Sequence, residues 1–218
     1  CSSDLIVLAI AKYSHQSQSI MKNKWVALLV LLWINTAISA NNNQFDDFFN
    51  ALESLSADFN QTTYSDTGVL LNNASGRFSF KRPQQLRWHT TKPNEQILLL
   101  NNNEFWLIDV ELEQASLQVN QDLSQTPLYW LINKPESLTH TPKLSHRKDG
   151  IDWYQTNNPS TQHQQLLFGF KNKKLHAISL KNALEQIILI VFDKIVINAE
   201  IKPKTFMLKL GPDFDIIR

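Results

Sequence analysis

The fold is decided by Arg77-Phe78-Ser79-Phe80-Lys81-Arg82-Pro83-Gln84-Gln85-Leu86-Arg87-Trp88-His89-Thr90. Apolar and polar side chains alternate on both sides of Arg82-Pro83. A period of two is typical of strands that bury one face and leave the other in water. The stretch therefore predicts two strands, each with one apolar face.

The same period continues along most of the chain. It begins at Ala57–Thr62, and further strand-like runs are Gln96–Leu100, Glu104–Asp109, Ala115–Val119, Ile151–Thr156, Gln164–Phe170, Lys174–Leu180, Ile187–Ile197 and Lys204–Leu210. Polar turn signals such as Asn101-Asn102-Asn103 and Lys148-Asp149-Gly150 separate them. Many short strands joined by short turns predict a mainly β protein with one antiparallel meander.

A helix is expected ahead of the sheet. Five apolar residues there recur with helical spacing: Phe45, Phe48, Phe49, Leu52 and Leu55. Such a stripe predicts a helix of about three turns with one buried face.

A second helix is expected in the middle of the chain, at Leu128–Ile132. Thr126-Pro127 is its predicted N-cap and first position, Lys134-Pro135 ends it, and Pro135 to Leu138 is expected to form another turn. A long sheet must curl, and its concave face must be covered. The two helices are the expected cover.

The N-terminal region predicts export. Met21-Lys22-Asn23-Lys24 is basic, Trp25 to Trp33 is apolar, and small residues then end at Ala40. This is the order of a secretory signal peptide, and the apolar run is about half the roughly 20 residues of a membrane-spanning helix. We expect residues 21–40 to be a signal peptide and residues 41–218 the exported domain.

Residues 1–20 precede this start signal. We expect them to be an upstream extension of the reading frame, and the alternative is that Cys1 is a lipidated first residue. Cys1 is the chain's one cysteine, so the exported domain would have no disulfide even in an oxidising periplasm. The formal net charge of +1 and the lack of a basic run argue against nucleic acid as a partner.

Patterns typical of catalysis are absent from the sequence. There is no Gly-x-Ser-x-Gly and no phosphate-binding Gly loop. The histidines of the exported domain have no metal-ligand spacing: His89, His140, His146, His163 and His176. We therefore expect no enzyme, no metal and no cofactor.

Several spaced motifs resemble the outer-membrane lipoprotein carrier family, LolA. In chain order they are Ala57-Asp58-Phe59-Asn60-Gln61, Lys81-Arg82-Pro83 with Leu86-Arg87-Trp88, Pro93-Asn94-Glu95-Gln96-Ile97-Leu98, Phe105-Trp106, Glu113-Gln114-Ala115, Thr126-Pro127 with Leu131-Ile132, and Phe206 with Gly211–Ile217. The resemblance covers nearly all of Phe45 to Ile217, and its motifs agree in order. It implies an unclosed half-barrel whose helical lid covers a hydrophobic cavity.

The cavity would be lined from the strands that follow Arg82. Trp88 and Trp106 offer large rigid apolar faces, and Leu86, Ile97 and Leu99 are candidates beside them. Residue type alone fits ordinary packing between sheet and lid equally well. The resemblance favours the cavity.

Arg82 is, by residue type, a solvated cation at the start of an apolar strand. In the family, this Arg closes the lid by donating to backbone carbonyls where the helices end. A guanidinium has five donors, and helix C-termini have carbonyls without partners. The implied partners in this chain are Phe49, Ile132 and Asn133.

The resemblance implies a monomeric periplasmic chaperone. It would take lipoproteins by their acyl chains from an inner-membrane lipoprotein-releasing ABC transporter and deliver them to an outer-membrane receptor lipoprotein. One alternative is a related lipid- or glycolipid-binding protein of the same fold; the receptor itself would need a Cys where Asn41 stands. The residues alone also leave open a secreted enzyme and a sensory domain that binds protein.

Overall fold

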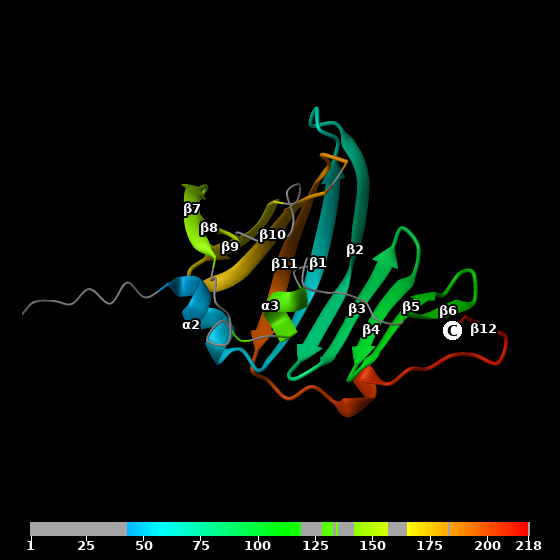
Figure 1. The fold of residues 1–218 in the computed structure, drawn as a ribbon. Helices are drawn as coiled ribbons and strands as arrows, with labels where there is room; N and C mark the ends of the chain where they lie inside the picture. Colours follow the sequence, from blue (N-terminus) through cyan, green and yellow to red (C-terminus); the bar gives the residue numbers. More distant parts are fainter. Residues whose placement is uncertain are drawn as a thin grey trace, which may run out of the picture. The chain divides into compact units, whose positions relative to one another are not determined.

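We describe the fold from a computed structural model (Figure 1). The described residues are 43–118, 128–132, 134, 142–156, 165–182 and 184–217. The chain separates into two compact units, Cys1–Ala40 and Asn41–Arg218, and the described residues all belong to the second. The expected signal peptide, the Thr126-Pro127 cap and the Pro135–Leu138 turn lie outside them.

One sheet organises this unit. Its strands are β1 (Ser54–Tyr64), β2 (Leu70–Lys81), β3 (Gln85–Lys92), β4 (Gln96–Asn101), β5 (Glu104–Asp109), β6 (Gln114–Gln118), β7 (Lys143–Lys148), β8 (Ile151–Gln155), β9 (Gln165–Lys171), β10 (Lys174–Lys181), β11 (Ile187–Ile197) and β12 (Asp215–Ile217). The 12-stranded order is β12-β6-β5-β4-β3-β2-β1-β11-β10-β9-β8-β7. The ends of this order do not pair with each other, so the sheet is curled but unclosed, and the expected fold class is confirmed (Figure 1).

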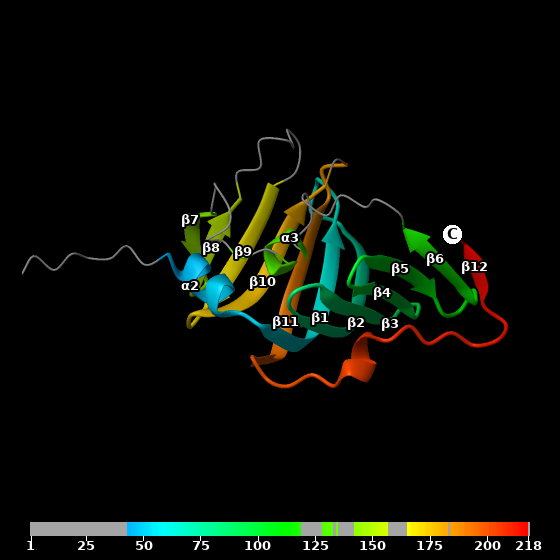
Figure 2. The same cartoon turned by 60° about the horizontal axis from the view of Figure 1, so that its bottom comes forward.

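Both helices lie on the same face of the sheet, which we call the inner face (Figure 2). Helix α2 spans Gln44–Ala51 and helix α3 spans Leu128–Ile132, where a helix was expected. The side chain of Asn43 caps α2 by accepting a hydrogen bond from the Phe45 amide at 3.2 Å. The other face, the outer face, is partly covered by the 3-10 helix η2 (Pro203–Phe206) and the chain after it.

Helix α2 is shorter than the three turns expected. Leu52 is already extended, and Leu55 belongs to β1. Asn198 explains the early end, because its side chain donates to the Ala51 carbonyl at 2.8 Å and accepts from the Glu53 and Ser54 amides at 2.8 and 3.2 Å. Leu55 still packs into the same cluster as Phe45 and Phe49, so the apolar stripe continues from helix into strand.

Two other expectations about the sheet are wrong. Lys204–Leu210 forms no strand, because Pro203 starts a 3-10 helix and the chain then runs across the outer face without pairing. The sheet is also not wholly antiparallel, since β12 pairs with β6 in parallel. Strands β7 and β12 were not predicted from the sequence, and each of them is an edge strand.

The described apolar residues form two clusters, one on each face. The inner cluster joins α2 and α3 to the strands; its largest fully buried side chains are Phe45, Phe49, Phe59, Phe78, Phe80, Phe168 and Phe170. The outer cluster is Ile97, Leu99, Trp106, Ile108 and Ala115, against which Val110, Leu117, Leu208, Leu210 and Phe214 pack.

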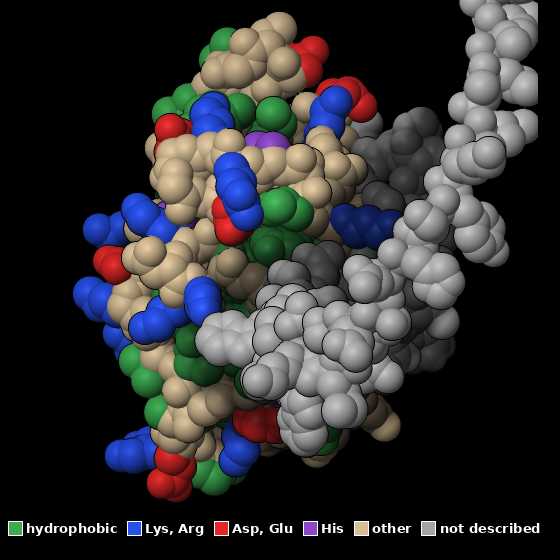
Figure 3. All heavy atoms as spheres, turned by 90° about the vertical axis from the view of Figure 1, so that its left-hand side faces the viewer, with side chains coloured by type: hydrophobic (Ala, Val, Ile, Leu, Met, Phe, Trp, Pro, Cys, Tyr) green, Lys and Arg blue, Asp and Glu red, His purple; other side chains and the backbone are tan. Residues whose placement is uncertain are grey.

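Strand β7 is an exposed edge of the sheet. All six of its residues are exposed, and four carry basic or imidazole side chains: Lys143, His146, Arg147 and Lys148. Figure 3 shows Lys and Arg side chains spread over this end. Charges on an edge strand oppose pairing with other chains.

In the part of the chain that the structure describes, no helix has the length and apolar character needed to span a bilayer.

Candidate functional site

Strand register decides which side chains can face a cavity. Trp88 pairs with Leu98, and Leu98 pairs with Leu107. Trp88 and Leu98 pack against the inner cluster. Leu99 and its partner Trp106 belong to the outer cluster.

The five side chains expected to line a cavity therefore divide between the two faces. Leu86 and Trp88 lie on the inner face, where Leu86 is fully buried in the cluster. Ile97, Leu99 and Trp106 pack on the outer face instead, under the C-terminal segment. Leu99 and Trp106 each differ by one residue in strand position from Leu98 and Leu107, and a shift of one residue moves a side chain to the opposite face of the sheet.

An apolar cavity of about 240 Å³ lies between the inner face and the helices. All its lining residues are apolar: Phe49, Phe78, Trp88, Leu98, Leu131, Phe168, Leu175, Ile178, Ile190 and Phe192. They come from both helices and six strands, so movement of either helix would change the volume of the cavity.

Aromatic contacts support the cavity from the sheet and from the helices. In the sheet, Trp88, which lines the cavity, stacks at a tilt on Phe59 with ring centroids 4.1 Å apart and lies 5.4 Å from Phe78. In the helices, Phe45 of α2 meets Trp130 of α3 edge-on at 5.2 Å; neither ring lines the cavity, but their helices supply Phe49 and Leu131, which do. Offset and edge-on aromatic pairs have preferred geometries, which favour this arrangement.

The surroundings of the helices disfavour charge. Burial raises the pKa of the Tyr154 hydroxyl, whose ring lies 6.2 Å from that of Phe45, and nearby Asp152 raises it further. Tyr154 does not line the cavity, but it belongs to the same apolar cluster. Because every residue that lines the cavity is apolar, a charge placed there would lose its hydration, and the cavity is suited to hydrocarbon rather than to polar ligands.

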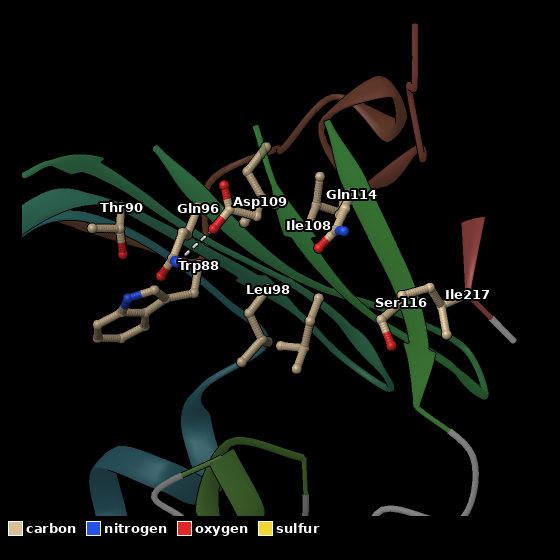
Figure 4. Close-up of a pocket in the computed structure, with 11 residues that line it drawn as sticks. Trp88, Thr90, Gln96, Leu98, Ile108, Asp109, Gln114, Ser116 and Ile217 are labelled. Carbon is tan, nitrogen blue, oxygen red and sulfur yellow. Dashed lines mark hydrogen bonds between the residues drawn. The ribbon is translucent and has the colours of Figure 1, made fainter. Parts of the chain in front are cut away.

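A second, more open hollow of about 380 Å³ lies farther along the same face. Trp88 and Leu98 border both hollows, and from the sheet they point toward the side of the helices (Figure 4). Leu107 and Ile217 extend its apolar lining toward β12, and Ile97 also borders it. A long apolar ligand in the cavity could continue into this hollow past Trp88.

Arg82 connects both helices to the turn between β2 and β3. Its Nε donates to the Leu131 carbonyl at 3.0 Å, and its Nη1 donates to the Phe49 carbonyl at 2.8 Å and to the Leu52 carbonyl. The Phe49 and Leu131 carbonyls belong to the last turns of α2 and α3, where no helical amide follows to bond them. The backbone amide of Arg82 donates to the Glu53 carbonyl at 2.9 Å, which holds the residue in place.

Of the three implied partners of Arg82, Phe49 is a direct contact. Asn133 lies outside the described residues, and only the backbone of Ile132 is described. Leu52 and Leu131 were not expected. Backbone carbonyls leave no signature in a sequence, and no motif could have indicated them.

Two more polar contacts near Arg82 were not predicted. Lys134, just after α3, forms an ion pair with Glu53 at 2.8 Å, and this hydrogen bond lowers the pKa of the Glu53 carboxyl. Asn198, at the end of β11, holds the junction of α2 and β1 through its side-chain amide.

Among the described residues, no three His, Cys, Asp or Glu side chains come together as a possible metal site.

Comparison with known proteins identifies the family. The sequence profile of the family described as outer membrane lipoprotein carrier protein LolA matches residues 50–209. The chain belongs to this family. The outer-membrane lipoprotein carrier protein of Pseudomonas aeruginosa is 29% identical over 184 residues, which cover 83% of this chain and 88% of that protein.

A second outer-membrane lipoprotein carrier protein has nearly the same sequence identity to this chain. That of Hahella chejuensis is 28% identical over 181 residues, covering 77% of this chain and 83% of that protein. A crystal structure of a LolA superfamily protein from Nitrosomonas europaea covers 76% of this chain and 94% of its own, with a TM-score of 0.47 and 12% identity. The matched residues 50–209 take in Arg82 and most of the cavity.

Proposed function

We propose that this protein is a periplasmic carrier that binds the acyl chains of lipoproteins released from the inner membrane and delivers them to the outer membrane. The observation that carries this proposal is a wholly apolar cavity beneath two helices, in a member of the lipoprotein carrier family. A lipoprotein with three acyl chains exposes on the order of 45 methylenes, or roughly 36 kcal/mol of unfavourable hydration. It therefore needs such a shelter to cross water.

The described form is the closed one, with both helices on the sheet. An engineered apolar cavity of about 150 Å³ holds one benzene, so about 240 Å³ holds roughly ten carbon atoms. That is less than one acyl chain. Cargo must therefore displace α2 or α3 from the inner face, and the second hollow beside Trp88 and Leu98 offers room for the rest of the chains.

Arg82 acts as the latch of this closed form. Its hydrogen bonds to Phe49, Leu52 and Leu131 exist only while both helices lie on the sheet. Hydrogen bonds from a charged donor contribute roughly 1.5–3 kcal/mol each. They lower the free energy of the closed state, which favours release of cargo that the cavity would otherwise hold too tightly.

The partners follow from this cycle. The carrier works as a monomer in the periplasm, receives cargo from an inner-membrane lipoprotein-releasing ABC transporter, and gives it to an outer-membrane receptor lipoprotein. A related lipid- or glycolipid-binding role on the same fold is the alternative, and the family assignment does not favour it.

The test is release of a lipoprotein from membranes that contain the transporter. With ATP and the exported protein, labelled lipoprotein is expected in the supernatant as a one-to-one complex. Leu98→Glu should abolish the complex, because the new carboxylate faces the hollow and must be desolvated. Leu112→Glu is the matched control, since Leu112 is exposed in the turn after β5 and should behave as the wild type. A supernatant without lipoprotein, or one with glycolipid in its place, would refute the proposal.

A further inference from the structure

Exposed aliphatic side chains gather at one end of the sheet. They are Val69, Leu70, Leu71, Leu184 and Ile187, exposed by 60%, 53%, 50%, 74% and 40%. Tyr64 brings the two groups together, because it pairs with Leu70 on β2 and with Ile187 on β11. We call these five residues the apolar tip. Isolated apolar side chains on a surface are ordinary, but a contiguous group marks a contact site.

The β1–β2 hairpin carries most of the apolar tip away from the sheet. Pairing of β2 with β3 begins only at Ser75, so Leu70–Ala74 have β1 as their one described neighbour strand. Figure 1 shows this hairpin projecting beyond the end of β3. A register shift between Thr63 and Tyr64 leaves Leu71 without a partner residue, and bulges of this kind redirect side chains.

Four backbone amides of the hairpin turn are bonded within the turn itself. The Ser65 amide donates to the Val69 carbonyl at 2.8 Å, and the Gly68 amide donates to the Ser65 carbonyl at 3.1 Å. The Val69 amide donates to the Ser65 hydroxyl at 3.0 Å, and the Thr67 amide donates to the Asp66 carboxylate at 2.8 Å. Backbone groups that enter lipid must be bonded internally, and these four amides already are.

The apolar tip is almost neutral. Asp66 is the one charged residue between Thr62 and Ser75. In the adjoining β10–β11 turn, Lys181 and Glu185 form an ion pair with each other. The charge at this end therefore complements neither a strongly acidic nor a strongly basic partner, and it fits a zwitterionic surface.

The size of the apolar tip also argues against a protein partner. A stable protein interface takes about 20–30 residues on each side and is centred on aromatic residues and Arg. The apolar tip offers five residues, all aliphatic. A lipid surface imposes no minimum area, and each fully buried Leu contributes about tenfold to partitioning into it.

We propose that the apolar tip is a membrane-contact site, which inserts its aliphatic side chains into the boundary between headgroups and acyl chains of a zwitterionic bilayer. The contact needs neither cargo nor a protein partner, so it goes beyond the carrier function. It is weak and reversible, because the five side chains are partly shielded already in the free protein.

A labelled variant tests the depth of insertion. The exported protein, residues 41–218, has no cysteine of its own, so Leu70→Cys gives it one thiol for an environment-sensitive fluorophore. With phosphatidylcholine–phosphatidylethanolamine vesicles, quenching by nitroxide on the upper acyl chain is expected. The control places the thiol by Ser145→Cys on β7, an exposed site away from the apolar tip, and should show no quenching. Equal quenching at both sites, or none at position 70, overturns the proposal.

A second experiment removes the aliphatic surface. Val69→Ser with Leu70→Ser and Leu71→Ser should lower vesicle binding by flotation at least tenfold. The matched control, Leu112→Ser with Leu144→Ser and Met207→Ser, removes three exposed side chains elsewhere and should bind as the wild type. Acyl-probe binding should survive in both, which separates this proposal from the carrier function. If the variant floats normally but loses docking only to transporter-containing vesicles, the apolar tip binds protein and the proposal is wrong.

Discussion

Leu98 and Leu99 are neighbours on β4, yet they belong to regions with opposite properties. Leu98 is half-buried and borders a cavity that the helices close. Leu99 is 1% exposed and packs under the C-terminal segment with Trp106. The inner face retains unfilled space, whereas the outer face is filled by the chain itself.

The difference shows how one sheet can be both adjustable and stable. The cover of the inner face is two short helices that Arg82 holds through backbone carbonyls, and we propose that this cover detaches. The cover of the outer face continues into β12, which is paired with β6. On this proposal, opening the inner face leaves the outer face intact.

The largest effect is expected for Leu99→Ala. Removing a fully buried Leu should lower the free energy of unfolding by about 2–5 kcal/mol. Acyl-probe binding by the folded fraction should stay the same, because Leu99 lies on the outer face. Urea unfolding and probe titration measure the two quantities. A loss of probe affinity in the folded protein would contradict the separation of the faces.

Arg82→Leu should alter the cargo equilibrium without much change in loading. The closed state loses hydrogen bonds that the open loaded state lacks, so transfer to a receptor should fall by about 10- to 100-fold. Arg82→Lys should be intermediate, because an ammonium cannot span several carbonyls at once. Labelled lipoprotein and acceptor membranes with the receptor provide the measurement. Transfer at the wild-type level would exclude the latch.

Leu98→Ala should destabilise the protein less than Leu99→Ala does. The side chain is only half-buried, and its removal enlarges a cavity that already exists, so a loss of about 1–2 kcal/mol is expected. Unfolding of the two variants under the same conditions gives the comparison. Equal losses would mean that the cavity is filled in solution.

The smallest effect is expected for Glu53→Gln, which removes the ion pair with Lys134. The pKa of Glu53 is lowered in the folded protein, so the pair stabilises it above the ordinary Glu range, and this contribution disappears as pH falls through the folded pKa. The variant should therefore unfold at a slightly lower temperature than the wild type at pH 7, and at the same temperature once the pH is below the folded pKa of Glu53. A difference that persists in acid would point to a role other than the ion pair.

Most strands were predictable from the sequence, but the face of the sheet on which each side chain lies was not. Ile97-Leu98-Leu99-Leu100 is apolar at every position, and so is Phe105-Trp106-Leu107-Ile108, because apolar clusters lie on both faces of β4 and β5. Where every residue is apolar, an alternation of apolar and polar residues is missing, and the sequence does not indicate which side chains lie on the inner face. The answer depends on Leu208, Leu210 and Phe214, more than a hundred residues beyond β4 in the sequence.

The C-terminal segment gives a similar lesson. Phe206, Leu208 and Leu210 recur at every second position as in a strand. Phe206 is buried, and Leu208 and Leu210 pack on the outer cluster, but the three residues pair with no strand. A period of two in the sequence indicates that one face of a segment is buried. It does not indicate that the segment forms hydrogen bonds with a neighbouring strand.

Arg82 was indicated only by its family motif, and its partners Leu52 and Leu131 could not be predicted because their contribution is a backbone oxygen.

The central claim is that the inner face alone holds acyl chains, and cross-linking at two adjacent positions tests it most directly. A photoreactive side chain is placed at position 98 in one protein and at position 99 in another, and each is loaded with lipoprotein and irradiated. A cross-link to lipoprotein at position 98 and none at position 99 is the predicted result. Cross-linking at position 99 equal to that at 98, or at neither position in a loaded complex, would contradict it.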